Sequence, residues 1–408
     1  MISILNVLNK ISCGLDVHKS FIVAVVIDNT KEEKYTKKFG TMPCELKELK
    51  EWVLSYKCTS VAMESTGKYW IPVYNILENS SIDLTLGNSR EIKNMPGRKT
   101  DFNDAVWIAK IHSHGLIPKS FIPPLEIREL RELTRYRRKL IQAKSTEKNR
   151  VNNCLTISNI MLDNVVTDVF GKSGNNIIDL ILKDEKINID TLSNITYGQV
   201  KKKGEEILKS IDSAISSNTK EKMKLLYGHI KTIDEMLDTI NELIDEKTKK
   251  YKKEIELLIT IPGVQKRSAE EIIAEIGIDM NQFEDSDHLA SWAGLSPGNN
   301  RSANTIKSSR TCEGNAYIKR ILAECSLGAS KEKKSYLGAK YWTLKSKRGT
   351  PKAITAISRV IIVSIWHMLS KKENFSKVDR ETYQKTIAEK NEKKMIKQLQ
   401  KLGYKVEK

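Results

Sequence analysis

The sequence has few cysteines, and none of the six forms a Cys-x-x-Cys pair, so a zinc-binding or disulfide-stapled protein is not expected. No apolar stretch approaches the roughly 18–20 residues of a membrane span. The first ten residues also lack the basic region and the small-residue cleavage site of a secretory signal. Together these absences predict a protein of the reducing cytosol that has no membrane partner.

Acidic residues are too few to balance the basic ones. Lys and Arg number 69 and Asp and Glu number 51, which gives a formal net charge of +18. A protein this basic usually meets a polyanion, and nucleic acid is the expected partner. The 408 residues predict two or three domains at roughly 100–200 residues each, and a hydrophobic fraction of 39% is enough for packed cores.

The first 120 residues have the pattern of a mixed α/β domain. Strands are predicted at 12–17, 21–27, 34–39, 61–63 and 82–86, and helices from Pro43 and over 67–77. The order β-β-β-α-β-α-β is that of an RNase H-like sheet. In such a sheet the first and fourth strands lie side by side, and a later helix packs across them.

Four carboxylates fall on these elements. Asp16 lies inside the first strand, Glu64 ends the fourth, and Asp101 and Asp104 share one face of a predicted helix. Oxygen ligands suit Mg²⁺, and two ions about 3.5–4 Å apart can hold the attacking and leaving oxygens of a phosphodiester. Taken singly, Asp16 could form a turn and Asp101 could cap a helix, but the order of the four favours a metal site.

The chain beyond 118–124, which holds three prolines, is predicted to be helical. Between Arg128 and Arg150 there are nine basic residues and three acidic ones. We predict that this basic helix contacts nucleic acid through the side chains of Arg128, Arg131, Arg135, Arg137, Arg138 and Lys139. Residues 156–217 are predicted to be irregular, and 171–176 is predicted to be a loop.

A heptad pattern follows, with apolar residues spaced 3-4-3-4-3-4 at Met223, Leu226, Ile230, Ile233, Leu237, Ile240 and Ile244. A strict period of 3.5 is typical of a coiled-coil seam. We expect a dimer or tetramer with this seam at the interface. The alternative is a long helix packed on its own domain.

Residues 254–370 form a third region. Helices are predicted on both sides of Ile261-Pro262-Gly263-Val264, which is the pattern of a helix-hairpin-helix. Such a motif presents backbone N–H groups to a phosphate, so Gly263 and Lys266 are predicted nucleic-acid contacts; an ordinary helical hairpin is the alternative. Residues 296–315 are predicted to be a loop, 317–329 and 354–369 helices, and the tail from Lys371 a solvated segment.

Several short motifs resemble those of the insertion-sequence 110 family of DEDD transposases. They are Gly-Leu-Asp-Val-His-Lys at 14–19, Met-Glu-Ser-Thr-Gly at 63–67, Lys-Thr-Asp-Phe-Asn-Asp-Ala at 99–105, Ile-Pro-Gly-Val at 261–264, Ala-Gly-Leu-Ser-Pro at 293–297 and Gly-Asn-Ala-Tyr-Ile-Lys-Arg at 314–320. The resemblance extends from about residue 13 to residue 370.

The resemblance implies an α/β plus all-α architecture. It implies an RNase H/RuvC-like catalytic domain at 1–120, a basic helical and coiled-coil linker at 121–253, a C-terminal transposase domain at 254–370 and a charged tail at 371–408. Its four acidic ligands map to Asp16, Glu64, Asp101 and Asp104, with Mg²⁺ or Mn²⁺ as the metal.

The resemblance further implies a nucleophilic serine in the second domain. The matching position is Ser302, and Ser308 and Ser309 in the same loop are the fallbacks. Nearby cations that would hold a phosphate are Arg301, Lys307 and Arg310. Because neither region holds both the carboxylates and the serine, the two domains are expected to meet, within one chain or between chains.

The partners implied are double-stranded donor and target DNA and a non-coding guide RNA from the element's own ends, in the bacterial cytosol or nucleoid. Two other functions stay open. One is a RuvC-like endonuclease of the Holliday-junction type, which would use the same carboxylates and water. The other is a non-catalytic scaffold. The four acidic residues argue against the scaffold, and the long basic and C-terminal sequence argues against a compact resolvase.

Overall fold

The computed structural model describes residues 6–65, 67–78, 80–89, 92, 101–298, 300–302, 305–308, 310–375, 392 and 395–396, and only the backbone at 101–103, 300–302 and 305–308. The chain divides into two compact units, 1–122 and 123–408. The further division of the second unit at residue 253 stays a prediction, and most of the predicted charged tail lies outside the described residues.

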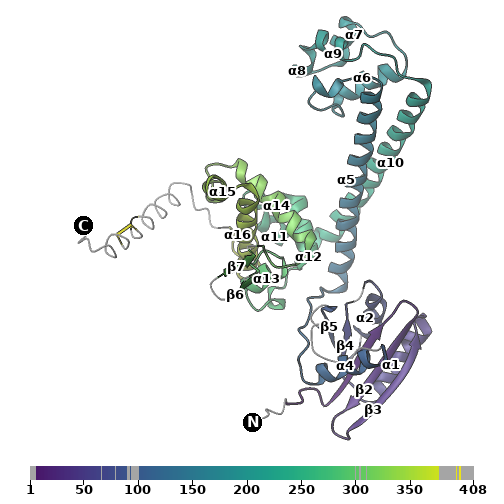
Figure 1. The fold of residues 1–408 in the computed structure, drawn as a ribbon, viewed down its shortest axis with the longest axis vertical. Coiled ribbons are helices and arrows are strands. Elements are labelled where there is room, and N and C mark those ends of the chain that lie inside the picture. Colours follow the sequence, from purple (N-terminus) through teal and green to yellow (C-terminus); the bar gives the residue numbers. More distant parts are fainter. Residues whose placement is uncertain are drawn as a thin grey trace. The chain divides into compact units, whose positions relative to one another are not determined.

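The N-terminal unit is built on a five-stranded sheet with the order β3-β2-β1-β4-β5 (Figure 1). The first three strands form an antiparallel meander, and β4 and β5 run parallel to β1. The bounds are β1 Ile11–Val17, β2 Phe21–Asp28, β3 Glu33–Gly40, β4 Ser60–Glu64 and β5 Asp83–Gly87. The prediction that the first and fourth strands are neighbours is therefore confirmed.

The sheet is covered on both faces because its central strands alternate between two cores. Cys13, Leu15 and Val17 of β1 are buried with residues of α1 (Pro43–Ser55) and α2 (Trp70–Glu78). The even-numbered residues of β1 point to the other face, since successive side chains of a strand alternate. That face is covered by α4 (Asp101–Ser113), whose Ala105 and Ala109 pack with β2.

Gly14 allows α4 to lie directly on β1. A Cβ atom at this position would come under 3.0 Å from backbone atoms of Ala105 and Ala109, closer than real Cβ atoms approach. The Ser12 hydroxyl donates to the Ala109 carbonyl at 3.2 Å and fixes the same crossing. The position of α4 on the sheet thus depends on the absence of one side chain.

Gly14→Ala is expected to destabilise the protein by about 1–3 kcal/mol, since the extra methyl group must push a helix off the sheet. The matched control is Gly228→Ala, where nothing lies within 4 Å and the residue sits inside a helix. That change should stabilise the protein by about 0.5–1 kcal/mol. Urea unfolding followed by circular dichroism measures both, and equal effects would contradict the close packing at Gly14.

The second unit contains two long helices, α5 (Leu125–Ile157) and α10 (Ser217–Thr248), which lie side by side in Figure 1. They run antiparallel, because Glu129 pairs with Lys247 and Glu147 pairs with His229. The heptad seam of α10 is buried at Met223, Ile230, Ile233, Ile240 and Ile244.

The prediction that this seam forms the interface of an oligomer is not needed to explain its burial. Helix α5 of the same chain covers it, as the alternative interpretation expected. A 3.5-residue period reports that a long helix has a helical partner, but it does not tell whether the partner belongs to another chain. The oligomeric state stays a prediction.

Residues 158–216, which we call the apex, join the far ends of these two helices. The prediction of irregular structure there is wrong, since four short helices form: α6 Lys172–Leu182, α7 Ile189–Ile195, α8 Gly198–Lys201 and α9 Gly204–Ser210. The predicted loop at 171–176 is also wrong, because α6 begins at Lys172. They share a core with α5 and α10 that includes Leu162, Ile177 and Ile207. Helices this short contain too few turns to show a clear period in the sequence.

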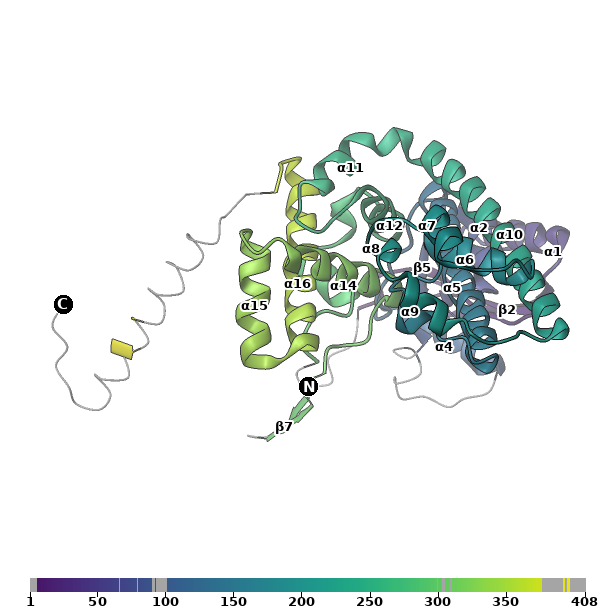
Figure 2. The same cartoon turned by 90° about the horizontal axis from the view of Figure 1, so that it is seen from above.

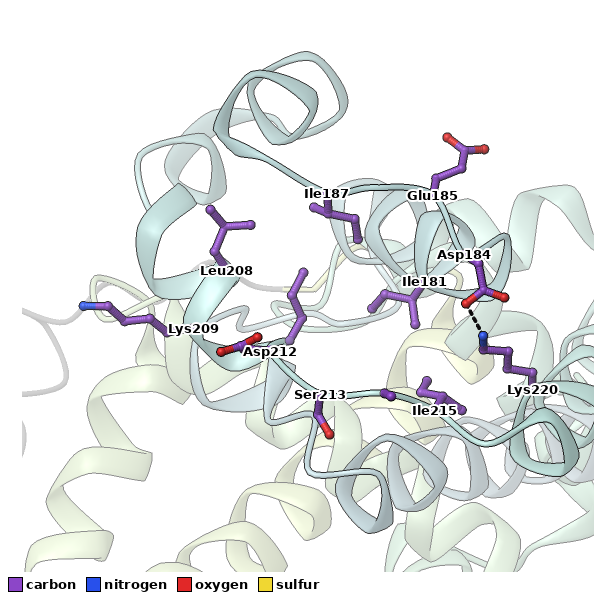
Figure 3. Close-up of a pocket in the computed structure, with 12 residues that line it drawn as sticks. Ile181, Asp184, Glu185, Ile187, Leu208, Lys209, Asp212, Ser213, Ile215 and Lys220 are labelled. Carbon is purple, nitrogen blue, oxygen red and sulfur yellow. Dashed lines mark hydrogen bonds and ion pairs between the residues drawn. The ribbon is translucent and has the colours of Figure 1, made fainter.

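A pocket of about 480 Å³ opens at the apex (Figure 3). Isoleucine and leucine side chains line it, and Asp184 forms an ion pair with Lys220 at its edge. None of the predicted site residues lines this pocket.

The C-terminal part of the second unit is mostly helical. Its helices are α11 Lys252–Ile259, α12 Lys266–Ile276, α13 Ser286–Trp292, α14 Ala316–Lys331, α15 Tyr336–Arg348 and α16 Thr350–Lys371. Figure 2 shows α14, α15 and α16 next to one another. By length and composition alone, α16 is apolar enough to cross a membrane. Its residues Ala353, Ile357, Ile361 and Ile365 are nevertheless buried in the core of this helical group.

Candidate active site

Asp16 and Glu64 lie at the same end of the neighbouring strands β1 and β4. We call this end of the sheet the carboxylate edge. Strands β1 and β4 are parallel, and Leu15 is paired with Met63, so the next residues of the two strands are neighbours. Leu15 and Met63 both point into the core beneath α1 and α2. Strand alternation therefore places Asp16 and Glu64 together on the opposite face, the one that α4 covers.

Helix α4 brings a third carboxylate to this edge. Ile108 and Ile111 of α4 pack against Ala62 of β4, and Asp104 lies one turn before Ile108. Asp101 is the first residue of α4, three positions before Asp104. Its side chain lies outside the described residues, so only its backbone can be placed.

The three carboxylates are close enough to influence one another. The pKa of Asp16 is raised mainly by burial, and the negative charges of Asp104 and Glu64 raise it further. The hydrogen bond to His18 opposes this shift. Within the described residues, no three Asp, Glu, His or Cys side chains gather tightly enough to hold a metal ion. Shared metal binding by all four carboxylates therefore stays a prediction, although the donors are the hard oxygens that Mg²⁺ and Mn²⁺ prefer.

His18 is a further neighbour of this site. Its Nε2 lies 2.9 Å from Oδ2 of Asp16, and its ring stacks on Phe21 with centroids 4.4 Å apart. The spacing Asp-x-His at the end of a strand could have revealed it, because residues two apart in extended backbone point to the same side. His112, in contrast, is a buried core residue whose ring nitrogen lies 2.7 Å from the Ser60 hydroxyl.

The segment predicted to be a loop at 296–315 forms a narrow antiparallel ribbon. Its strands are β6 Asn300–Ser302 and β7 Thr305–Ser308, and Ser302 is paired with Thr305 at the tip. The ribbon continues to its base, where the Gly298 amide donates to Arg310 and the Cys312 amide donates to Ser296, both at 2.9 Å. The side chains of Arg301, Ser302, Lys307 and Ser308 are outside the described residues, and so are Asn299, Asn304 and Ser309.

Two glycines hold the base of the ribbon together. Gly294 has a φ of +71°, and a Cβ on Gly314 would come under 3.0 Å from the Gly294 backbone. Asn315 then caps α14 by accepting the amide hydrogens of Tyr317 and Ile318. The two glycine-containing motifs at 293–297 and 314–320 are thus neighbours in space because their backbones touch.

Four of the arginines predicted to bind nucleic acid form hydrogen bonds and ion pairs within the chain. Arg135 forms a bidentate pair with Glu275 of α12, and Arg131 donates to the carbonyls of Ala274 and Glu275. Burial lowers the pKa of Arg131 to about 10, so it stays charged at neutral pH. Arg138 pairs with Glu271 of α12 and Glu324 of α14, and Arg137 donates to Asn241 of α10.

This ion network ties α5 to the C-terminal helices and gives four of the six arginine and lysine residues predicted to contact nucleic acid a structural role. The side chain of Glu275 is only 2% exposed, and it also accepts a hydrogen bond from Asn315 at the end of the ribbon. Removing one partner of a buried pair costs about 3–5 kcal/mol, because the other charge is left without compensation. The arginines therefore hold the structure. Of the six predicted contacts, Arg128 and Lys139 stay predictions, and Arg128 donates to the Pro123 carbonyl.

The predicted phosphate contacts at Gly263 and Lys266 both have partners within the chain. Gly263 has a φ of +87°, and a Cβ there would come under 3.0 Å from backbone atoms of Cys325 and Ala329 in α14. Lys266 pairs with Asp245 of α10 at 2.6 Å. The turn between α11 and α12 is therefore packed against α14, as an ordinary helical hairpin would be.

Comparison with known families defines the class of protein. A family model described as a transposase of the DEDD type matches residues 13–160, which include Asp16, Glu64 and Asp104. A second, described as "Transposase IS116/IS110/IS902 family", matches residues 255–343, which run from α11 through the ribbon and α14 into α15. A search of curated proteins gives no match.

The chain is thus a transposase, an enzyme that catalyses DNA strand transfer. It belongs to the IS110 family of insertion-sequence transposases. Its substrate is DNA, and its DEDD-type domain depends on a divalent metal ion.

Proposed function

We propose that this transposase exchanges DNA strands through Asp16, Glu64, Asp101 and Asp104, with Mg²⁺ as the metal, and through Ser302 as the nucleophile. The observation that carries the proposal is the placement of Asp16 and Glu64 at adjacent ends of two parallel strands, with Asp104 on the helix that crosses them. The strand order supports a RuvC-like fold for this unit. A metal bound by these oxygens would stabilise the negative charge that develops on the phosphate.

In the proposed reaction the Ser302 hydroxyl loses its proton and forms a bond to the phosphorus, while one deoxyribose oxygen leaves and takes up a proton. The same type of oxygen on the partner strand later attacks the phosphoserine, which rejoins the DNA and frees Ser302. A serine hydroxyl is a weak nucleophile at neutral pH and needs activation. The carboxylate unit and the ribbon must therefore meet, in one chain or between chains of a dimer or tetramer.

A non-coding guide RNA from the element's ends, by family resemblance, would choose the donor and target DNA in the bacterial cytosol. The net charge of +18 supports a polyanionic partner without distinguishing RNA from DNA.

The test combines the purified chain with labelled donor and target duplexes, the transcribed RNA and Mg²⁺. Joined strands and protein-bound DNA are expected, and both should disappear when EDTA removes the metal. Omission of the RNA should remove the joined product. Cleaved DNA that never becomes attached to protein would instead identify water as the nucleophile, as in a RuvC-like endonuclease.

A further inference from the structure

Residues 331–352 carry the most one-sided charge of the C-terminal part. They hold eight Lys and Arg residues and one acidic residue, Glu332. Seven of the eight are grouped here as the α15 cationic surface, which consists of Lys331, Lys333, Lys334, Lys345, Lys347, Arg348 and Lys352. Helix α15 itself contributes Lys345, Lys347 and Arg348 in its last turn.

The positive charges of this surface are not neutralised by carboxylates in the described part of the chain. There, none of its seven cations forms an ion pair with a carboxylate, whereas Arg131, Arg135, Arg137 and Arg138 of α5 are all paired with glutamates. A paired arginine has little field left for a phosphate, while an unpaired lysine can release a counterion when it binds one. The α15 cationic surface therefore offers a polyanion charge that these four arginines of α5 do not.

Trp342 organises the surface. Its side chain is 42% exposed, and its indole nitrogen donates to the Ser330 carbonyl at 2.9 Å, which fixes the ring. The ammonium groups of Lys345 and Lys333 lie 4.5 and 5.7 Å from the ring centre. A cation held over an aromatic face loses less freedom when it later contacts a phosphate.

The surface continues toward the ribbon that carries Ser302. After α15 the chain turns at Gly349 into α16, and Lys352 lines a groove of about 980 Å³. The other cations of this groove are Arg310, at the base of the ribbon, Lys319 of α14 and Arg359 of α16. Lys319 donates to the Thr311 hydroxyl at 2.8 Å, whereas Arg359 donates to Ser296 and forms an ion pair with Asp287.

We propose that the α15 cationic surface binds the phosphate backbone of duplex DNA that flanks the exchanged strand, and that the groove at Lys352 leads this DNA to the ribbon. The choice of DNA as the polyanion rests on the proposed function. The surface offers charged groups to phosphates, and phosphate contacts carry no sequence information, so binding should not depend on sequence.

The test is the salt dependence of binding to a labelled 40-base-pair duplex in EDTA, where no strand is cut. K345A/K347A/R348A should make the slope of log K against log salt shallower by about 2.7, since each lost phosphate contact removes about 0.9. K345E/K347E/R348E should weaken binding at least ~10-fold at 0.15 M salt. Thermal unfolding of each variant checks that the fold is kept.

The matched control is K186E/K201E/K202E, which makes the same change in net charge on exposed lysines of the apex. It should change affinity less than about 2-fold, because these lysines lie outside the α15 cationic surface and salt screens distant exposed charges. Equal weakening by both glutamate triples would mean that only net charge matters and would overturn the proposal. Weakened binding of a structured RNA with unchanged duplex DNA binding would overturn it in favour of RNA.

The outcome is separable from that of the proposed function. Normal DNA binding through α15 in a chain that never joins strands would overturn the proposed function alone. Unchanged binding by the α15 variants, in a chain that does join strands, would overturn this inference alone.

Discussion

Asp16→Asn is expected to lower strand transfer by about 10²–10³-fold and, at neutral pH, to raise the melting temperature of the metal-free protein. The first effect follows because the variant loses a carboxylate that would hold the metal and offset charge on the phosphate; the loss of one such stabilising group commonly costs about 10²–10³-fold. The second effect follows from the pKa of Asp16, which burial and the carboxylates of Asp104 and Glu64 raise.

The sign of the stability change follows from that direction. A carboxyl whose pKa is higher in the folded protein stabilises the fold below its unfolded pKa, and this contribution is lost as the pH rises through the folded pKa. At neutral pH the ionised Asp16 is therefore a cost to the fold that asparagine removes. Mg²⁺ should raise the melting temperature of the wild type and leave that of the variant unchanged, since only a bound ligand stabilises.

Asp28→Asn is the control, because Asp28 lies in the same sheet with the opposite shift. The hydrogen bond from Thr30 is the main cause that lowers the pKa of Asp28, so its ionised form stabilises the fold at neutral pH. This stability is lost as the pH falls through the folded pKa. The variant should melt at a lower temperature and transfer strands normally. If Asp16→Asn still transfers strands at the wild-type rate, the carboxylate edge is not the metal site.

The sheet and its carboxylate edge could be predicted because both depend on local patterns. Alternation of β-branched residues marked the strands, and the position of Asp16 inside an apolar strand indicated a special role. Strand order then placed Glu64 beside it. How closely α4 approaches the sheet was not predictable. It depends on Gly14, which has no side chain and therefore lets the backbone of a helix about 90 positions away come close.

The basic residues were harder to interpret because charge in a sequence does not reveal its partner. Arg135 and Lys345 look alike along the chain, yet Glu275 neutralises the first from 140 residues away and nothing in the described chain neutralises the second. The heptad seam of α10 is ambiguous for the same reason, since the pattern does not reveal that α5 of the same chain packs against it. Long-range pairing decides both cases, and composition alone does not contain it.

Ser302→Ala is expected to lose the covalent protein–DNA adduct and the joined product together, while DNA affinity stays within about 2-fold of the wild type. One neutral hydroxyl adds little to an interface dominated by phosphate charge, and a neutral hydrogen bond contributes only about 0.5–1.5 kcal/mol. The readout is denaturing gel electrophoresis of labelled DNA, in which a phosphoserine link keeps the label with the protein.

The position of Ser302 in the ribbon sharpens the control. Its backbone is paired with Thr305 at the tip, whereas Ser308 is paired with Asn300 nearer the base. A nucleophile that must reach a phosphate held by another unit is better placed at the tip, so Ser308→Ala should keep the adduct. The reverse result, an adduct that survives Ser302→Ala and disappears in Ser308→Ala or Ser309→Ala, would move the nucleophile along the ribbon. An adduct that forms in none of the proteins, the wild type included, would leave water as the attacking group and the carboxylate edge as the whole of the catalytic site.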